Sequence, residues 1–172
     1  WGNLVLGDGW LKSLGFIDFA GSTVVHSTAA WIVLAAYLSL KAKYKQEIIK
    51  KDLIFEDYKI LSLALAGFVL WLAWSGLNVT YISAISVDIG MVVINALLAL
   101  FGSIVSPLLF SLFLNHKIIS GSELIKATLG SLVAITASCA FVSSSLAFII
   151  GLVSGLLTLY TPRILARWVD SR

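Results

Sequence analysis

Long uncharged apolar stretches constrain this chain more than any other feature of its sequence. Residues 60–82 contain no charged side chain, and residues 19–40 contain none except His26. A membrane-spanning helix needs roughly 20 apolar residues, because it rises about 1.5 Å per residue across the hydrocarbon core. Only 12% of the residues are charged and 59% are hydrophobic, whereas a soluble domain carries roughly 25% charged residues. The sequence therefore predicts an all-α integral membrane protein.

The apolar runs and the polar breaks between them predict five membrane-spanning helices. Their expected bounds are about 18–40, 60–82, 89–114, 122–140 and 146–169. Pro107 lies late in the third helix and predicts a kink there, because proline lacks the backbone donor. We expect residues 1–172 to be part of a single membrane domain. The chain opens without Met or a signal-peptide pattern, so we expect it to be an internal piece of a longer protein.

Lysine and arginine are distributed unequally between the two ends of these helices. Of the 12 in the chain, all but Lys12 fall on one side, in the loop 41–59, at Lys117 and Lys126, and after Pro162. Cytoplasmic segments of membrane proteins carry an excess of positive charge. This bias predicts that the loop 41–59 and the C-terminal end are cytoplasmic and that the N-terminal end is outside.

The residue types exclude several kinds of site. The sequence contains no nucleophile–base pair, no metal-ligand cluster and no phosphate-binding loop, and its one cysteine cannot form an internal disulfide. We therefore expect neither an enzyme nor a protein that binds a metal, another cofactor or nucleic acid.

Small residues recur at helical spacing on two of the expected helices. Lipid provides no hydrophobic driving force between helices, so close packing of small side chains holds them together. The positions are Ala147, Gly151 and Gly155 on the fifth helix, and Gly67, Ala73 and Gly76 on the second.

The most specific motif is Asp18-Phe19-Ala20-Gly21-Ser22-Thr23-Val24-Val25-His26. Asp18 suits a helix N-cap, because its carboxylate can accept hydrogen bonds from the first free backbone N–H groups. His26 would lie about 12 Å further along that helix. An ionisable side chain at this depth is costly in lipid, so we expect it to face protein or a cavity.

This motif resembles the signature at the start of the fifth membrane helix of the ammonium transporter (Amt/MEP/Rh) family, and every residue from 18 to 26 matches. Residues 70–78 are similar to the sixth helix of that family, with both tryptophans, Gly76 and Asn78 at the same spacing. Residues 132–139 and 149–155 are similar to parts of the eighth and ninth helices. The resemblance, which fits the Amt branch, implies helices five to nine of an eleven-helix fold made of inverted repeats.

The resemblance also implies a function. Family members are homotrimers of the plasma membrane, and each subunit conducts ammonium or ammonia through a narrow apolar pore lined by two histidines. His26 corresponds to the first of them, and Asp18 to the aspartate below the outer recruitment site. Trp74 and Leu70 correspond to pore-lining positions, and Ala20 to a position whose carbonyl faces the recruitment site. In microbial relatives a PII-type signalling protein binds the cytoplasmic face and is a candidate partner here.

The chain departs from the family pattern at several positions. The phenylalanine gate is Leu77, the serine that binds the recruited cation is Tyr81, and the outer tryptophan falls at Leu6. The second pore histidine belongs to the tenth helix, beyond this chain, and His116 does not replace it. An ammonium sensor with little or no transport is therefore an alternative, and a Rh-like gas channel is a third.

Without the resemblance, two of these residues keep simpler explanations. Asp18 could be a plain helix cap, and Trp74 could serve only packing.

Overall fold

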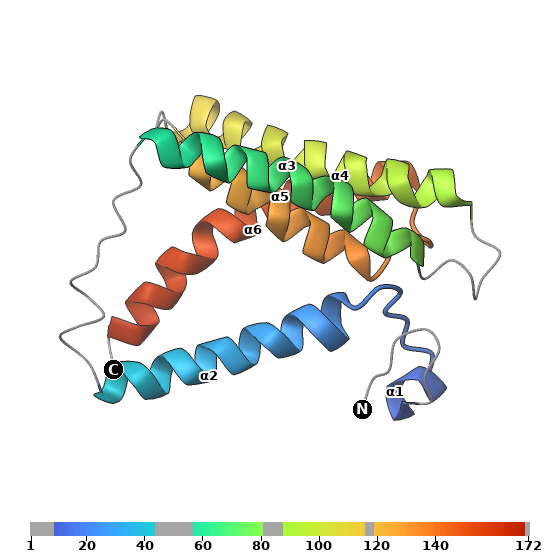
Figure 1. The fold of residues 1–172 in the computed structure, drawn as a ribbon, viewed down its shortest axis with the longest axis horizontal. Coiled ribbons are helices and arrows are strands. Elements are labelled where there is room, and N and C mark those ends of the chain that lie inside the picture. Colours follow the sequence, from blue (N-terminus) through green and yellow to red (C-terminus); the bar gives the residue numbers. More distant parts are fainter. Residues whose placement is uncertain (1–8, 44–56, 81–87, 116–118, 171–172) are drawn as a thin grey trace.

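The computed structural model describes residues 9–43, 57–80, 88–115 and 119–170, and all regular structure in these ranges is helical. The elements in chain order are α1 (Trp10–Ser13), the π-helix η1 (Ser22–Ser27), α2 (Thr28–Lys43), α3 (Asp57–Thr80), α4 (Ile89–Phe110), the π-helix η3 (Ser111–Asn115), α5 (Gly121–Thr136) and α6 (Ser144–Asp170) (Figure 1).

Four helical stretches are long and apolar enough to cross a membrane, which confirms the expected all-helical membrane class. They are Ser22–Leu40, Leu61–Thr80, Ile89–Phe113 and Ser144–Pro162. α5 is shorter, because it ends at Thr136 instead of the predicted residue 140, and residues 137–142 form turns. Its 16 residues span only about 24 Å at the usual helical rise.

Short polar side chains explain where the helices begin. The Asp88 side chain caps α4 by accepting a hydrogen bond from the Gly90 N–H at 2.8 Å. Ser120 and Glu123 form a reciprocal capping box at the start of α5, so two free backbone donors are satisfied. Pro107 lies inside α4, and a π-helix follows it within one turn.

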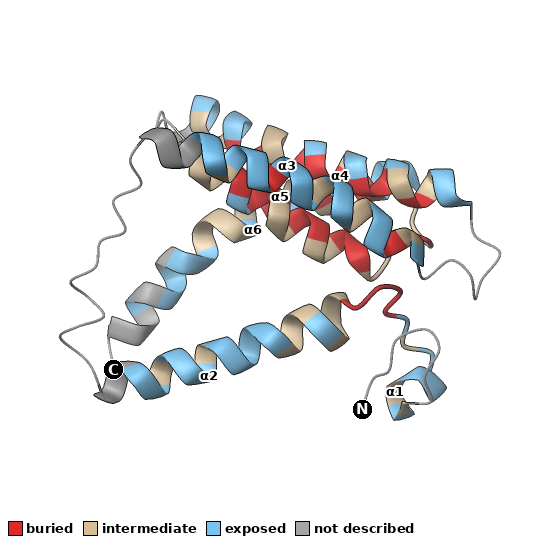
Figure 2. Cartoon of the chain, viewed as in Figure 1, coloured by how far each residue is buried: buried red, intermediate tan, exposed pale blue. Residues whose placement is uncertain are grey.

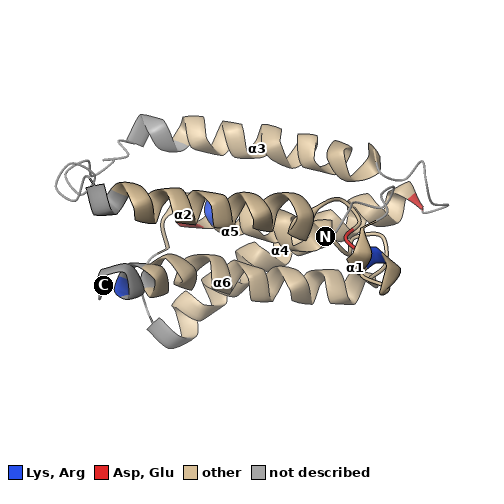
Figure 3. Cartoon of the chain, turned by 90° about the horizontal axis from the view of Figure 1, so that it is seen from below, with Lys and Arg blue, Asp and Glu red and all other residues tan. Residues whose placement is uncertain are grey.

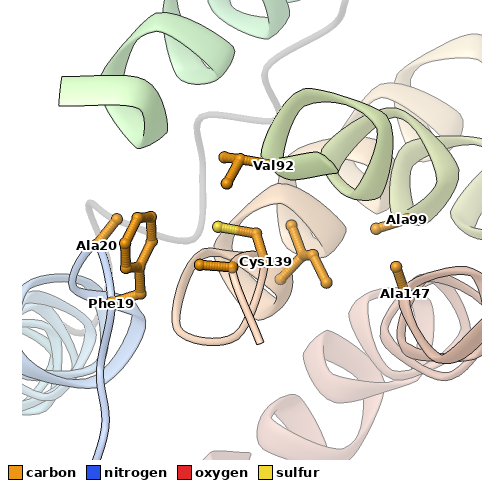
Figure 4. Close-up of a cluster of buried hydrophobic side chains, with 8 residues drawn as sticks. Phe19, Ala20, Val92, Ala99, Cys139 and Ala147 are labelled. Carbon is orange, nitrogen blue, oxygen red and sulfur yellow. The ribbon is translucent and has the colours of Figure 1, made fainter. Parts of the chain in front are cut away.

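α4 and α6 pack closely through their small residues. A Cβ atom added at Gly151 would collide with the backbone of Ala99, and one at Gly155 would lie 2.7 Å from the Ser103 Cα. Ala147 is fully buried and faces Ala99 (Figure 4). The small-residue packing expected on the fifth helix is confirmed, and the two backbones approach as such interfaces require.

α3 uses only one of its three expected small positions against the described part of the chain. A Cβ atom at Gly67 would meet the Ile125 side chain of α5 at 3.3 Å. Ala73 and Gly76 are exposed instead. Packing at these two positions therefore stays a prediction.

The buried side chains gather where α4, α5 and α6 meet, whereas α2 is largely exposed (Figure 2). Trp31, Ile32 and Val33 of α2 are each at least 65% exposed. Charged residues in the described part lie mostly towards the helix ends, so the helix middles carry few charges (Figure 3). Apolar surface of this kind suits contact with lipid or with further helices.

Candidate functional site

Asp18 is buried in front of the first π-helix. Its side chain is 3% exposed, and Oδ2 accepts hydrogen bonds from the backbone N–H groups of Thr23 at 3.0 Å and Val24 at 2.7 Å. Oδ1 is also buried and has no hydrogen-bond partner within the described ranges. The carboxylate therefore satisfies free N–H groups of the helix as predicted, from a position outside the helix.

The helix itself begins later than predicted, at Ser22 rather than at Asp18. Gly21 precedes it with a φ of 97°, a left-handed conformation that glycine adopts without a steric penalty. The reason for the late start is an interaction with a distant part of the chain. The Phe19 N–H donates to the Ala137 carbonyl at 3.0 Å, and the Ala20 N–H donates to the Thr136 carbonyl at 3.1 Å.

These two hydrogen bonds hold residues 18–21 against the C-terminal end of α5. The last carbonyls of an α-helix have no partner within the helix, so they are available to such a segment. The Phe19 and Ala20 side chains are buried and lie beside Cys139 and Val92 in the same apolar cluster (Figure 4). The Phe19 ring also meets the Phe141 ring edge-on, with centroids 5.9 Å apart.

His26 lies in the π-helix η1 and is stacked on Trp74 of α3. Their ring centroids are 4.9 Å apart, and the ring planes differ by 23°. The His26 backbone N–H donates to the Gly21 carbonyl, which is the five-residue spacing of a π-helix. Single π-helical turns occur frequently at functional sites. The structure thus brings together two residues that the sequence had placed in one pathway.

Thr136, at the end of α5, forms hydrogen bonds with both Trp74 and the segment that carries Asp18. From the sequence, no role had been assigned to this residue. Its Oγ1 accepts a hydrogen bond from Trp74 Nε1 at 2.8 Å and donates to the Leu132 carbonyl. Its own carbonyl accepts the Ala20 N–H described above. Its place within residues 132–139, the segment similar to the eighth helix of the family, was the available signal for this residue.

Asn95 of α4 holds the turn that follows α5. Its fully buried side-chain amide donates to the carbonyls of Cys139 at 2.8 Å and Val142 at 2.9 Å. Buried carbonyls need partners of this kind. Asn95 therefore supports the same turn whose first residues receive the N–H groups of Phe19 and Ala20.

The remaining predicted site residues lie on α3 or beyond the described part. Leu70 and Leu77 are 43% and 39% exposed, and they flank Trp74 at spacings that share one helix face. Tyr81, Leu6 and His116 lie outside the described residues. Among the described residues, no group of three potential metal ligands occurs.

The assembled groups have a definite chemistry. An imidazole can donate a hydrogen bond from one nitrogen while it accepts at the other. The indole face beside it presents the negative part of an aromatic quadrupole, and a buried carboxylate lies at the start of the same helix. This combination suits a path for a small cation or for a proton.

Comparisons with known proteins identify the family to which this chain is similar. The profile of the Ammonium Transporter Family matches residues 1–170. The Synechocystis sp. protein sll0537 is 34% identical over 161 residues, which are 93% of this chain and 30% of that relative. The ammonium transporter Amt2 of Archaeoglobus fulgidus is 30% identical over 172 residues, which are 93% of this chain and 36% of Amt2.

A solved structure, named a sensor Amt protein, superposes with a TM-score of 0.76 at 36% identity. The match covers 90% of this chain and 38% of that one. The chain spans about a third of the length of each of these three relatives. The profile match alone covers nearly the whole sequence, which confirms the resemblance carried by residues 18–26. This chain belongs to the Ammonium Transporter Family.

Proposed function

We propose that this chain supplies helices five to nine of an ammonium transporter subunit and that ammonium or ammonia passes His26 on its way across the membrane. The N-terminal end lies outside and the loop 41–59 is cytoplasmic, as the charge bias favours. The complete subunit resides in the plasma membrane as a homotrimer, and a PII-type protein binds its cytoplasmic face. Family membership supports these assignments.

The single observation that carries the proposal is the stack of His26 on Trp74. A bare ammonium ion in hydrocarbon is prohibitively costly, whereas neutral ammonia with a separately relayed proton is not. An imidazole held beside an aromatic face is a suitable relay, because its two nitrogens exchange donor and acceptor roles. Asp18, buried eight residues earlier, favours a cation at the outer end of the path, where Ala20 also lies.

The deciding experiment measures ammonium-evoked current in proteoliposomes that contain the complete subunit. We expect a saturating current that His26→Ala abolishes or reduces strongly. His116→Ala is the matched control, because it removes the other histidine of the chain, which we place in a cytoplasmic loop. An unchanged current in His26→Ala would overturn the assignment of this residue.

An ammonium sensor is the second candidate. The solved structure described above carries a sensor name and is 36% identical, and the gate and recruitment positions here are Leu77 and Tyr81. A folded subunit that binds ammonium but carries no current would favour the sensor.

A further inference from the structure

We propose that Thr136 is a positioning residue, which holds the Trp74 indole flat against His26 and fixes the Asp18 segment to the same point of α5. The effect on ammonium flux rests on the proposed function. The geometry itself rests on the hydrogen bonds of Thr136 alone.

Two hydrogen bonds fix the orientation of the Thr136 hydroxyl. A hydroxyl has one proton to donate and two lone pairs that can accept. The proton goes to the Leu132 carbonyl on the preceding turn, so a lone pair is left for the Trp74 indole N–H at 2.8 Å. The donor on α3 and the acceptor on α5 thus fix the rotation of the indole ring.

Burial makes this hydrogen bond hard to replace. Thr136 is fully buried, so bulk water cannot substitute for its hydroxyl. Trp71, one turn earlier on α3, provides an internal comparison, because its indole N–H is buried without a partner in the described ranges. A hydrogen bond is therefore not an automatic consequence of an indole packing in this interface, and the one at Trp74 is specific.

The same residue also sets the other end of the site. Its backbone carbonyl accepts the Ala20 N–H at 3.1 Å, two residues after Asp18. The segment that carries Asp18 and the Trp74 indole that faces His26 are thus both hydrogen-bonded to Thr136. Thr136 therefore helps to set the distance between the Asp18 carboxylate and the His26 imidazole.

The test compares Thr136→Val, which keeps the shape but loses the hydroxyl, with Thr136→Ser, which keeps the hydroxyl. Both are made in the complete subunit. The first readout is the NMR signal of the Trp74 indole N–H, assigned by its loss in Trp74→Phe, together with the ring-current shift of the His26 protons. We expect Thr136→Val to move both signals and Thr136→Ser to leave both close to the parent.

The second readout is ammonium-evoked current. We expect Thr136→Val to lower the maximal current about threefold to tenfold, which corresponds to the loss of one hydrogen bond. Thr136→Ser should stay within about twofold. In a Trp74→Phe background, Thr136→Val should cause no further loss, because the donor has already been removed.

The outcomes decide whether the Thr136 hydroxyl acts through Trp74. Equal losses in the parent and in the Trp74→Phe background would overturn the action of Thr136 through Trp74, and so would unmoved indole and imidazole signals in Thr136→Val. Where Thr136→Val does not fold, Thr136→Ala removes the same hydroxyl with less apolar volume, and the same two readouts apply. An unsubstituted subunit that neither conducts nor binds ammonium would contradict the proposed function. The NMR signals would still decide whether Thr136 positions Trp74.

Discussion

The imidazole of His26 and the indole of Trp74 lie face to face, with centroids 4.9 Å apart and planes 23° apart. The two residues come from different helices, η1 and α3, so neither orientation is a local property of the sequence. The stack places an ionisable ring beside an aromatic face, and the two ring nitrogens of an imidazole lie at its edge, where hydrogen bonds form. His26 and Trp74 therefore form one packed pair that joins η1 to α3.

Replacing Trp74 with leucine should reduce ammonium-evoked current about threefold to tenfold, because an aromatic pair contributes about 0.5–1.5 kcal/mol beyond its buried area. The measurement is the maximal current of the complete subunit in proteoliposomes. Trp31→Leu is the matched control, since Trp31 is 69% exposed on α2 and is not the ring stacked on His26. Equal effects of both substitutions would contradict a specific role for the stack.

Asp18→Ala should destabilise the subunit by about 1–2 kcal/mol, because it leaves two half-buried backbone donors without an acceptor. These donors are the N–H groups of Thr23 and Val24. Asp18→Asn retains a carbonyl oxygen that can accept from them, so a loss of about 1 kcal/mol or less is expected. The check is the midpoint of thermal unfolding in detergent, and equal midpoints for the two variants would show that the capping bonds matter little.

The sequence predicted the helical membrane class and the family, because uncharged runs and a specific motif are local signals. The start of η1 could not be predicted in the same way. Asp18 has the chemistry of an N-cap. However, the N–H groups of Phe19 and Ala20 donate to the carbonyls of residues 137 and 136, respectively, more than a hundred positions away. That pairing keeps residues 18–21 out of the helix.

The end of α5 was missed for a related reason. Residues 137–140 are small or apolar and contain neither Gly nor Pro, so no local signal ends the helix there. The chain turns because Asn95 offers its amide to the carbonyls of Cys139 and Val142. The contact between Trp74 and Thr136 also joins distant helices, which is why Thr136 carried no role before the fold was known.

Gly151→Ala should weaken the contact between α4 and α6 by about 1–3 kcal/mol, the usual cost of overpacking a close interface. The added methyl group would collide with the backbone of Ala99, which cannot rotate away. Gly67→Ala is the control, because its Cβ would meet side chains instead of backbone, Ile125 at 3.3 Å and Trp71 at 4.0 Å. Thermal unfolding in detergent should separate the two variants, and a Gly151→Ala subunit as stable as Gly67→Ala would argue against backbone contact at this site.

Asn95→Leu should destabilise the turn after α5 by about 2 kcal/mol, since the buried Cys139 carbonyl and the half-buried Val142 carbonyl lose their donor. The turn carries Ala137, whose carbonyl accepts the Phe19 N–H, so the disturbance should reach the Asp18 segment. Amide hydrogen exchange tests this directly, with faster exchange expected at Phe19 and Ala20. Exchange that accelerates only near Asn95 would show that the turn and the Asp18 segment are independent.

Leu77→Phe addresses the gate position, where the family carries phenylalanine. An aromatic ring facing a cation contributes about 0.5–2 kcal/mol, which is up to about thirtyfold in occupancy. Leu77 is 39% exposed on α3, three residues after Trp74, so a larger ring can be accommodated without displacing buried atoms of the described helices. We expect Leu77→Phe to lower the ammonium concentration that gives half-maximal current, with Leu65→Phe, an exposed position three turns earlier on α3, as the control. A half-saturating concentration that stays at the parent value would mean that position 77 does not meet the cation, and recruitment would then depend on other groups of the subunit.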